Sequence, residues 1–187
     1  MSCSAHHRNL KIENSLVIFC DLQVGFQHNI QNIADIIDAA TFLRNSARLL
    51  SIPCLFSEQW PERYGHVVEK LDPADEQVFS KRTFSLMGSP RGSELVRSKK
   101  REYIVFAGVQ SHICVQQSVL DLLANGFSVF LVTDAMGSRR RIEHTTALES
   151  MKQEGAMVST TEAIVFQWLR SVDAPCFDAF QQLQRPT

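Results

Sequence analysis

The chain has 187 residues, of which 44% are hydrophobic and 21% are charged, and its formal net charge at pH 7 is −1. A chain of this length and composition can bury a full core and fits one globular domain. The near-zero charge gives no overall field that favours nucleic acid or a membrane surface, and no apolar run approaches the roughly 18 residues of a membrane span.

The five cysteines are widely spaced, and no Cys-x-x-Cys pair occurs. This pattern predicts neither a disulfide framework nor a structural zinc site, and it favours a reducing compartment such as the cytoplasm. Residues 1–13 lack the apolar segment of a secretory signal and predict a flexible tail before a single domain over residues 14–187. Because the tail is basic before Glu13, a short mitochondrial presequence is the alternative interpretation.

The predicted elements alternate between strands and helices along the chain. Apolar runs at 15–20 and 52–56 indicate buried strands on either side of an amphipathic helix at 33–50. Residues 57–77 are predicted to be a loop. The later predicted elements are strands at 78–79, 103–106, 127–132 and 156–159, and helices at 93–97, 113–124, 139–154, 160–171 and 175–184. This order predicts an α/β fold of three layers, with a parallel sheet between two layers of helices.

Three chemically complementary residues follow predicted strands. Asp21 follows strand 15–20, Lys81 follows strand 78–79, and Cys114 lies in the first turn of the helix after strand 103–106. Since the carboxyl ends of neighbouring parallel strands face one crevice, we expect these side chains to meet there. Each residue alone has an ordinary explanation, as a capping carboxylate, a surface lysine or a buried cysteine.

Together the three residues have the chemistry of a nucleophilic site. Lys81 and the helix N-terminus are expected to stabilise the Cys114 thiolate and to lower the thiol pKa below its usual value of about 8.5. Asp21 would accept the thiol proton and later deliver it to a leaving group. The backbone N–H groups around Gln110 and Cys114 would hold a developing oxyanion.

Four short segments carry a resemblance to a known family. They are residues 17–23 (VIFCDLQ), 80–85 (SKRTFS), 108–115 (GVQSHICV) and 132–135 (VTDA). In this order and spacing, the chain resembles the isochorismatase-like cysteine hydrolase superfamily over about residues 14–170. Within this superfamily, the residues of these segments most resemble those of the eukaryotic isochorismatase-domain-containing proteins, including protozoan members labelled mitochondrial-associated ribonuclease.

The resemblance implies a Rossmann-like domain with a six-stranded parallel sheet and a catalytic triad of Asp21, Lys81 and Cys114. It also implies a cis peptide bond between Val109 and Gln110 that helps to build the oxyanion hole, and a homo-oligomer such as a dimer or tetramer. Because Cys114 is present, we expect acyl transfer through a thioester rather than the vinyl-ether cleavage of isochorismatases that lack this cysteine.

The segment after the second strand departs from the metal-binding members of the superfamily. Nicotinamidases carry an Asp-x-His pair and a later His there, whereas residues 57–61 of this chain read SEQWP. Glu58 and a remote His66 are too few ligands for a zinc site. We therefore predict no metal and no other cofactor.

The leading hypothesis is a metal-independent cysteine hydrolase of small amides or related C–N or acyl bonds. The candidate residues for the walls of its substrate pocket are Gln23, Phe26, Trp60, Phe84 and His112. Core packing or orientation of a loop would also explain each of them.

The alternatives are a non-catalytic binding or scaffold protein of the same fold, a ribonuclease, and a metal-dependent nicotinamidase. The neutral charge and the lack of a basic surface interleaved with aromatic residues disfavour nucleic acid. Asp134 and Arg139 are expected to cap or pair at a helix start rather than to touch substrate.

Overall fold

The computed structural model describes residues 10–73 and 76–183, which fold around one six-stranded sheet in the order β3-β2-β1-β4-β5-β6. Every neighbouring pair of strands is parallel. The strands are β1 (Ser15–Cys20), β2 (Cys54–Gln59), β3 (Gln77–Lys81), β4 (Tyr103–Val109), β5 (Ser128–Gly137) and β6 (Met157–Ser159). The predicted six-stranded parallel sheet is confirmed.

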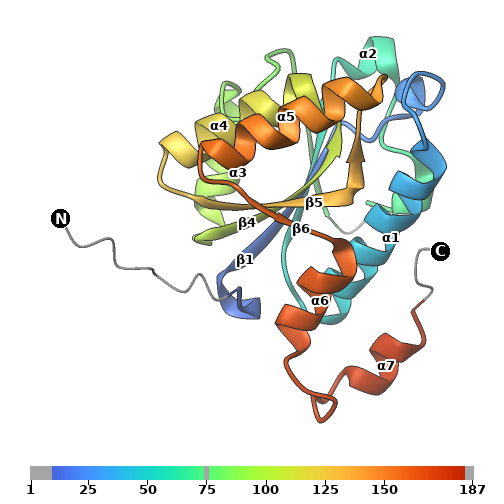
Figure 1. Cartoon of the computed structure of the whole chain (residues 1–187), viewed down its shortest axis with the longest axis vertical. Helices are drawn as coiled ribbons and strands as arrows, with labels where there is room; N and C mark the ends of the chain where they lie inside the picture. Colours follow the sequence, from blue (N-terminus) through green and yellow to red (C-terminus); the bar gives the residue numbers. More distant parts are fainter. Residues whose placement is uncertain (1–9, 74–75, 184–187) are drawn as a thin grey trace.

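Helices cover both faces of the sheet, so the predicted three layers are also confirmed (Figure 1). One face carries α1 (Ile33–Leu49), α6 (Thr161–Leu169) and α7 (Phe177–Gln181), and the other carries α3 (Pro90–Ser98), α4 (Gln116–Ala124) and α5 (Arg141–Gln153). The four-residue α2 (Pro61–Tyr64) follows β2.

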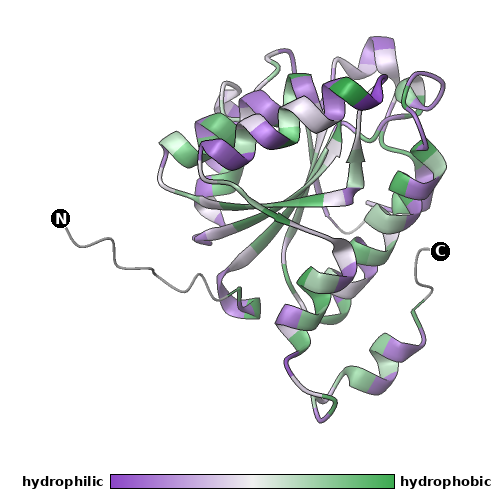
Figure 2. Ribbon diagram, viewed as in Figure 1, coloured by the Kyte–Doolittle hydropathy of each residue, from purple (hydrophilic) through white to green (hydrophobic). Residues whose placement is uncertain are grey.

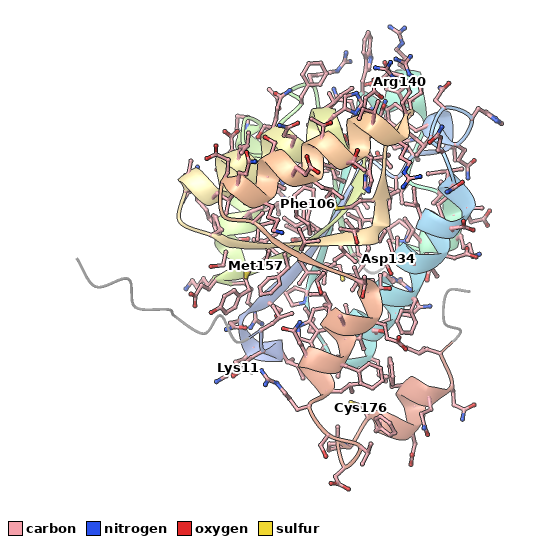
Figure 3. All side chains as sticks on the ribbon, in the orientation of Figure 1. Lys11, Phe106, Asp134, Arg140, Met157 and Cys176 are labelled. Carbon is pink, nitrogen blue, oxygen red and sulfur yellow. The ribbon has the colours of Figure 1, made fainter. Side chains whose placement is uncertain are left out.

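The central strands β1 and β4 are buried along their whole length, and the middle of the sheet is mostly hydrophobic (Figure 2). Continuous apolar runs, rather than alternating ones, are typical of strands that are covered on both faces. Phe19 and Phe56, on neighbouring strands, stack with ring centroids 4.7 Å apart. Phe106 lies on the opposite face, in the core formed with α3, α4 and α5 (Figure 3).

The strands differ from their predicted lengths at their carboxyl ends. β2 continues through Ser57, Glu58 and Gln59, all of them buried, where the sequence predicts a loop. The predicted strand stops where the apolar run stops, but these polar side chains remain buried because each forms hydrogen bonds. The predicted loop at 57–77 also contains α2 and a 3₁₀ turn, Glu69–Leu71.

The described domain begins before residue 14. Leu10 is fully buried in the core, and Arg170 donates a 3.2 Å hydrogen bond to its carbonyl oxygen. Most of the predicted tail, residues 1–9, lies outside the described residues, so the presequence alternative stays a prediction. None of the described helices has the length and apolar character needed to span a membrane.

The order of the strands reverses at the carboxyl ends of β1 and β4. The chain runs outward from β1 to β2 and β3, and then returns to place β4 on the other side of β1. Loops leave the two adjacent strands in opposite directions at this point, which is where open α/β sheets bind ligands.

Candidate active site

Asp21 follows β1 at the point where the strand order reverses, and it is fully buried. Its φ of +54° lies in the left-handed region, and its backbone N–H donates a 3.1 Å hydrogen bond to the Ser57 carbonyl on β2. Both carboxylate oxygens are engaged: Oδ1 accepts from Ser57 Oγ at 2.6 Å, and Oδ2 accepts from Lys81 Nζ at 2.8 Å. The carboxylate is thus held in one orientation.

Lys81 is the last residue of β3, and its buried side chain passes the end of β2 to reach Asp21. Besides Asp21, Nζ contacts Gln59 Oε1 at 2.7 Å and the carbonyl oxygens of Phe84 at 3.0 Å and Thr83 at 3.4 Å. Burial lowers the pKa of Lys81, but the nearby acidic groups outweigh burial and the net direction is upward. Lys81 is therefore an ammonium ion.

Cys114 lies in η4, a π-helical turn (Ser111–Val115) between β4 and α4. The residue is 7% exposed. Its Sγ lies 3.9 Å from Gln59 Oε1, and the charges of Asp21 and Lys81 both act on its pKa. The structure thus brings Asp21, Lys81 and Cys114 together from three separate strands. Single π-helical turns within helices are frequent at functional sites.

The pKa of the Cys114 thiol differs in direction from the prediction. Burial and the Asp21 carboxylate raise the pKa of Cys114 to about 12, although Lys81 acts in the opposite direction. The sequence predicts a lowered pKa because it places Cys114 at a helix start near a lysine, but it does not reveal the burial. At neutral pH the Cys114 side chain is a thiol, so a reaction at sulfur needs a base, and the Asp21 carboxylate is near enough to act on its pKa.

The backbone before Cys114 is suited to an oxyanion. The Val109–Gln110 peptide bond is cis, as the resemblance implies. Within the described part of the chain, the Gln110 N–H donates to no backbone or side-chain acceptor. An unused donor beside the nucleophile turn is available to a developing negative charge.

Gly108 allows β4 to approach β1 beside the triad. Its φ is +125°, and an added Cβ would lie 2.1 Å from the carbonyl oxygen of Cys20, its partner in the ladder. Only glycine fits both the space and this backbone conformation. Gly108 therefore sets the position of the turn that carries Gln110 and Cys114.

Among the predicted pocket walls, Gln23 is buried and engaged with the backbone. Its side-chain oxygen accepts from the Gln59 N–H at 2.7 Å, and its Nε2 donates to the Gln59 carbonyl at 3.1 Å and to the Gly65 carbonyl. The structure places Gln23 as a support for the end of β2 rather than on the surface of a pocket.

The aromatic candidates lie in the loops after β1, β2 and β3. Phe26 stacks on Tyr64 at 4.7 Å, and Tyr64 meets Trp60 edge-on at 6.4 Å. The Arg82 guanidinium lies 4.5 Å from the centre of the Trp60 ring. Phe84 is 52% exposed, although its carbonyl contacts Lys81. Their contact with substrate stays a prediction.

His112 and Asp134 have structural partners. His112 Nδ1 is 3.0 Å from Ser138 Oγ, and its Nε2 is 3.7 Å from a Glu143 oxygen. Asp134 accepts a 2.9 Å hydrogen bond from the Thr161 N–H at the start of α6, so it pairs at a helix start as expected. Arg139 is exposed just before α5. Figure 3 labels Asp134 and also Arg140, the residue that follows Arg139.

Glu58 is used by the protein itself. Its carboxylate accepts from the Val67 N–H at 2.9 Å and lies 3.2 Å from His66 Nδ1. Over residues 10–73 and 76–183, no three or more His, Cys, Asp or Glu side chains gather as metal ligands would.

Sequence reasoning missed two residues of this site, Ser57 and Gln59. Both lie at the end of β2 and contact the triad directly. The strand order would have indicated them. In that order β2 lies between the strands that carry Asp21 and Lys81, so the polar residues after the apolar run of β2 lie between these two side chains. Without the strand order the sequence places them in a loop.

Comparison with known proteins finds a matching family model and similar relatives. The isochorismatase domain model matches residues 15–163. Isochorismatase family protein 1A of Dictyostelium discoideum is 33% identical over 165 residues, which cover 85% of this chain and 80% of that protein. Isochorismatase domain-containing protein 1 of Salmo salar is 34% identical over 176 residues, covering 94% of this chain but only 62% of the relative's length.

Among solved structures, one titled as MAR1 ribonuclease from Caenorhabditis elegans superposes with a TM-score of 0.88 and 33% identity. The match covers 93% of this chain and 91% of that one.

Proposed function

The chain belongs to the isochorismatase domain family, and from this premise we propose that it is a metal-independent cysteine hydrolase of small amides or related acyl compounds. The observation that carries the proposal is the grouping of a buried carboxylate, an ammonium group and a thiol. Lys81 Nζ pairs with Asp21 at 2.8 Å, and Lys81 Nζ and Cys114 Sγ both contact the oxygen of one side-chain amide, that of Gln59. This combination suits acyl transfer to sulfur.

In the proposed first step, Asp21 takes the thiol proton while Cys114 Sγ attacks the substrate carbonyl carbon. The carbonyl oxygen becomes negative and receives hydrogen bonds from the N–H groups of Gln110 and Cys114. Lys81 stays protonated and stabilises the negative charge around sulfur. The raised thiol pKa is consistent with proton transfer during the attack rather than a thiolate that exists beforehand.

In the second step, the tetrahedral intermediate expels the amine, which takes the proton from Asp21, and a thioester remains on Cys114. Water then attacks the thioester, Asp21 accepts a proton from it, and the thiol leaves as the carboxylic acid is released. The sum is one amide and one water converted to one acid and one amine. No step needs a metal.

The limited exposure of the nucleophile favours small substrates. Cys114 is 7% exposed and Asp21 is fully buried, so a compact acyl group reaches the thiol more readily than a polymer does. The exposed Phe84 ring and the half-buried Trp60 are the proposed apolar contacts for it.

The proposal is tested with a panel of small primary amides, ureas and N-carbamoyl compounds, with release of ammonia or amine as the signal. The native chain is expected to turn over at least one class and to accumulate an acyl adduct on Cys114 that intact-mass spectrometry detects. C114S should lose turnover and adduct while keeping its melting temperature. Turnover that persists in C114S would overturn the proposal, as would the absence of turnover across the panel.

RNA cleavage is the second candidate, because the Caenorhabditis elegans neighbour is titled a ribonuclease. A labelled single-stranded RNA assayed with the native chain and C114S distinguishes the two. Under the amide proposal neither protein cleaves it. Cleavage by the native chain that disappears in C114S would favour the ribonuclease.

A further inference from the structure

The side chain of Gln59 has no part in the reaction steps above, yet it contacts two of the three triad residues. Its Oε1 lies 2.7 Å from Lys81 Nζ and 3.9 Å from Cys114 Sγ. The residue is buried, with 7% of its surface exposed. A buried amide in this position faces the reacting groups rather than solvent.

The orientation of the Gln59 amide is determined by its other end. Nε2 donates a 3.1 Å hydrogen bond to the Arg82 carbonyl oxygen. Because that carbonyl can only accept, the NH₂ group must point to Arg82 and the oxygen must point to Lys81 and Cys114.

The backbone of Gln59 is also held in place. The Gln23 side chain accepts from the Gln59 N–H at 2.7 Å and donates to its carbonyl oxygen at 3.1 Å. A side chain with a fixed backbone, a fixed amide plane and an oxygen directed at the reacting groups is a preorganised acceptor.

That oxygen can only accept hydrogen bonds. In the resting site its donors are one N–H of the Lys81 ammonium and the S–H of Cys114. We infer that Gln59 is a positioning residue, which holds the Cys114 thiol for transfer to Asp21 and keeps the Lys81 ammonium between the thiol and the carboxylate. The inference rests on the proposed function for the identity of the nucleophile.

This arrangement requires a neutral oxygen. Removal of the oxygen and addition of a negative charge should therefore have opposite effects on the ionisation of Cys114. In Q59M the thiol loses its acceptor and Lys81 is free to approach sulfur, which favours the thiolate. In Q59E a carboxylate competes for Lys81 and repels the thiolate, which disfavours it. A residue that only filled space would not give effects of opposite sign.

The experiment measures the rate of Cys114 alkylation by iodoacetamide against pH, with the modified cysteine located by mass spectrometry. At pH 8 we expect Q59M to react at least about threefold faster than the native chain, and Q59E at least about threefold slower, since the thiolate fraction changes faster than its nucleophilicity. Q59N, too short to reach both partners, should behave like Q59M if Q59E fails to fold.

The matched control is Q116M. Gln116 follows the nucleophile turn in α4, and its amide donates to Ser150 Oγ rather than to the triad. Its alkylation profile should equal that of the native chain. With any amide substrate found, the Gln59 variants should lower kcat with little change in KM.

The outcomes separate this inference from the proposed function. Gln59 variants that shift alkylation in one direction only, or not at all, overturn the positioning role even if the native chain hydrolyses amides. Opposite shifts without any amide turnover support the positioning role and count against the proposed reaction. A Cys114 that resists alkylation in every variant up to pH 10 would overturn the positioning role, whereas the proposed reaction is then decided by the amide panel alone.

Discussion

The hydroxyl of Ser57 on β2 donates a 2.6 Å hydrogen bond to Oδ1 of Asp21, which follows β1. With Oδ2 occupied by Lys81 at 2.8 Å, the carboxylate cannot rotate without breaking one of these bonds. The strand that separates Asp21 from Lys81 thus also orients the proposed base.

Replacement of Ser57 by alanine should destabilise the fold and reduce turnover. A hydrogen bond to a buried charged group contributes about 2 kcal/mol, so the free energy of unfolding of S57A, measured with urea, should be lower by that amount. Ser46 is the matched control, because it is fully buried in α1 and its hydroxyl has no hydrogen-bond partner in the described part of the chain. S46A should be neutral or stabilising; equal losses in both variants would refute the role of the Ser57–Asp21 bond.

Replacement of Asp21 by asparagine should separate reactivity from catalysis. Asparagine tolerates the left-handed backbone of this position, and it removes the negative charge that raises the pKa of Cys114. We expect faster alkylation of Cys114 at pH 8 but turnover lower by about 100-fold or more, because the base is lost. Slower alkylation in D21N would mean that the carboxylate activates the free thiol directly.

Replacement of Lys81 by methionine should leave the buried Asp21 charge without its cation. Breaking such a pair costs about 3–5 kcal/mol, which urea unfolding at pH 7 measures. The double variant D21N/K81M should recover part of this loss, since no buried charge then remains. Additive losses in the double variant would show that the two side chains do not act as a pair.

Replacement of Gly108 by alanine should disrupt the approach of β4 to β1. The added Cβ would lie 2.1 Å from the Cys20 carbonyl oxygen, whereas at Gly126, with φ +84°, nothing lies within 4 Å. G126A therefore measures the backbone strain alone, about 1 kcal/mol. G108A should lose several times as much stability and the reactivity of Cys114; similar melting temperatures for the two variants would refute this.

Stability should fall in alkaline solution. Burial raises the pKa of Cys20 well above its ordinary value and, with Asp21, that of Cys114 to about 12. In the unfolded chain both thiols ionise near pH 9, so the unfolded state loses protons first and gains stability as pH rises from there. The free energy of unfolding should therefore decline from about pH 9 to 12, less steeply in C114A. An unchanged slope in C114A would argue against the burial of this thiol.

The amino-acid sequence by itself determined the fold class, the order of the strands and helices along the chain, and the three residues that meet. Continuous apolar runs require a sheet covered on both faces, and Asp21, Lys81 and Cys114 each follow such a run or begin the next helix. Strand ends were less certain, because a polar residue such as Ser57 ends an apolar pattern without ending a buried strand when it has a hydrogen-bond partner.

Only the tertiary structure decided what surrounds those three residues. The placement of β2 between β1 and β3 brings Ser57 and Gln59 into the site and sets the Gln23 side chain against the backbone of Gln59. It also reversed the expected ionisation of Cys114, since the pKa of a thiol depends on how much water and which charges lie around it. Those are properties of contacts between distant segments, which a local pattern of residues does not contain.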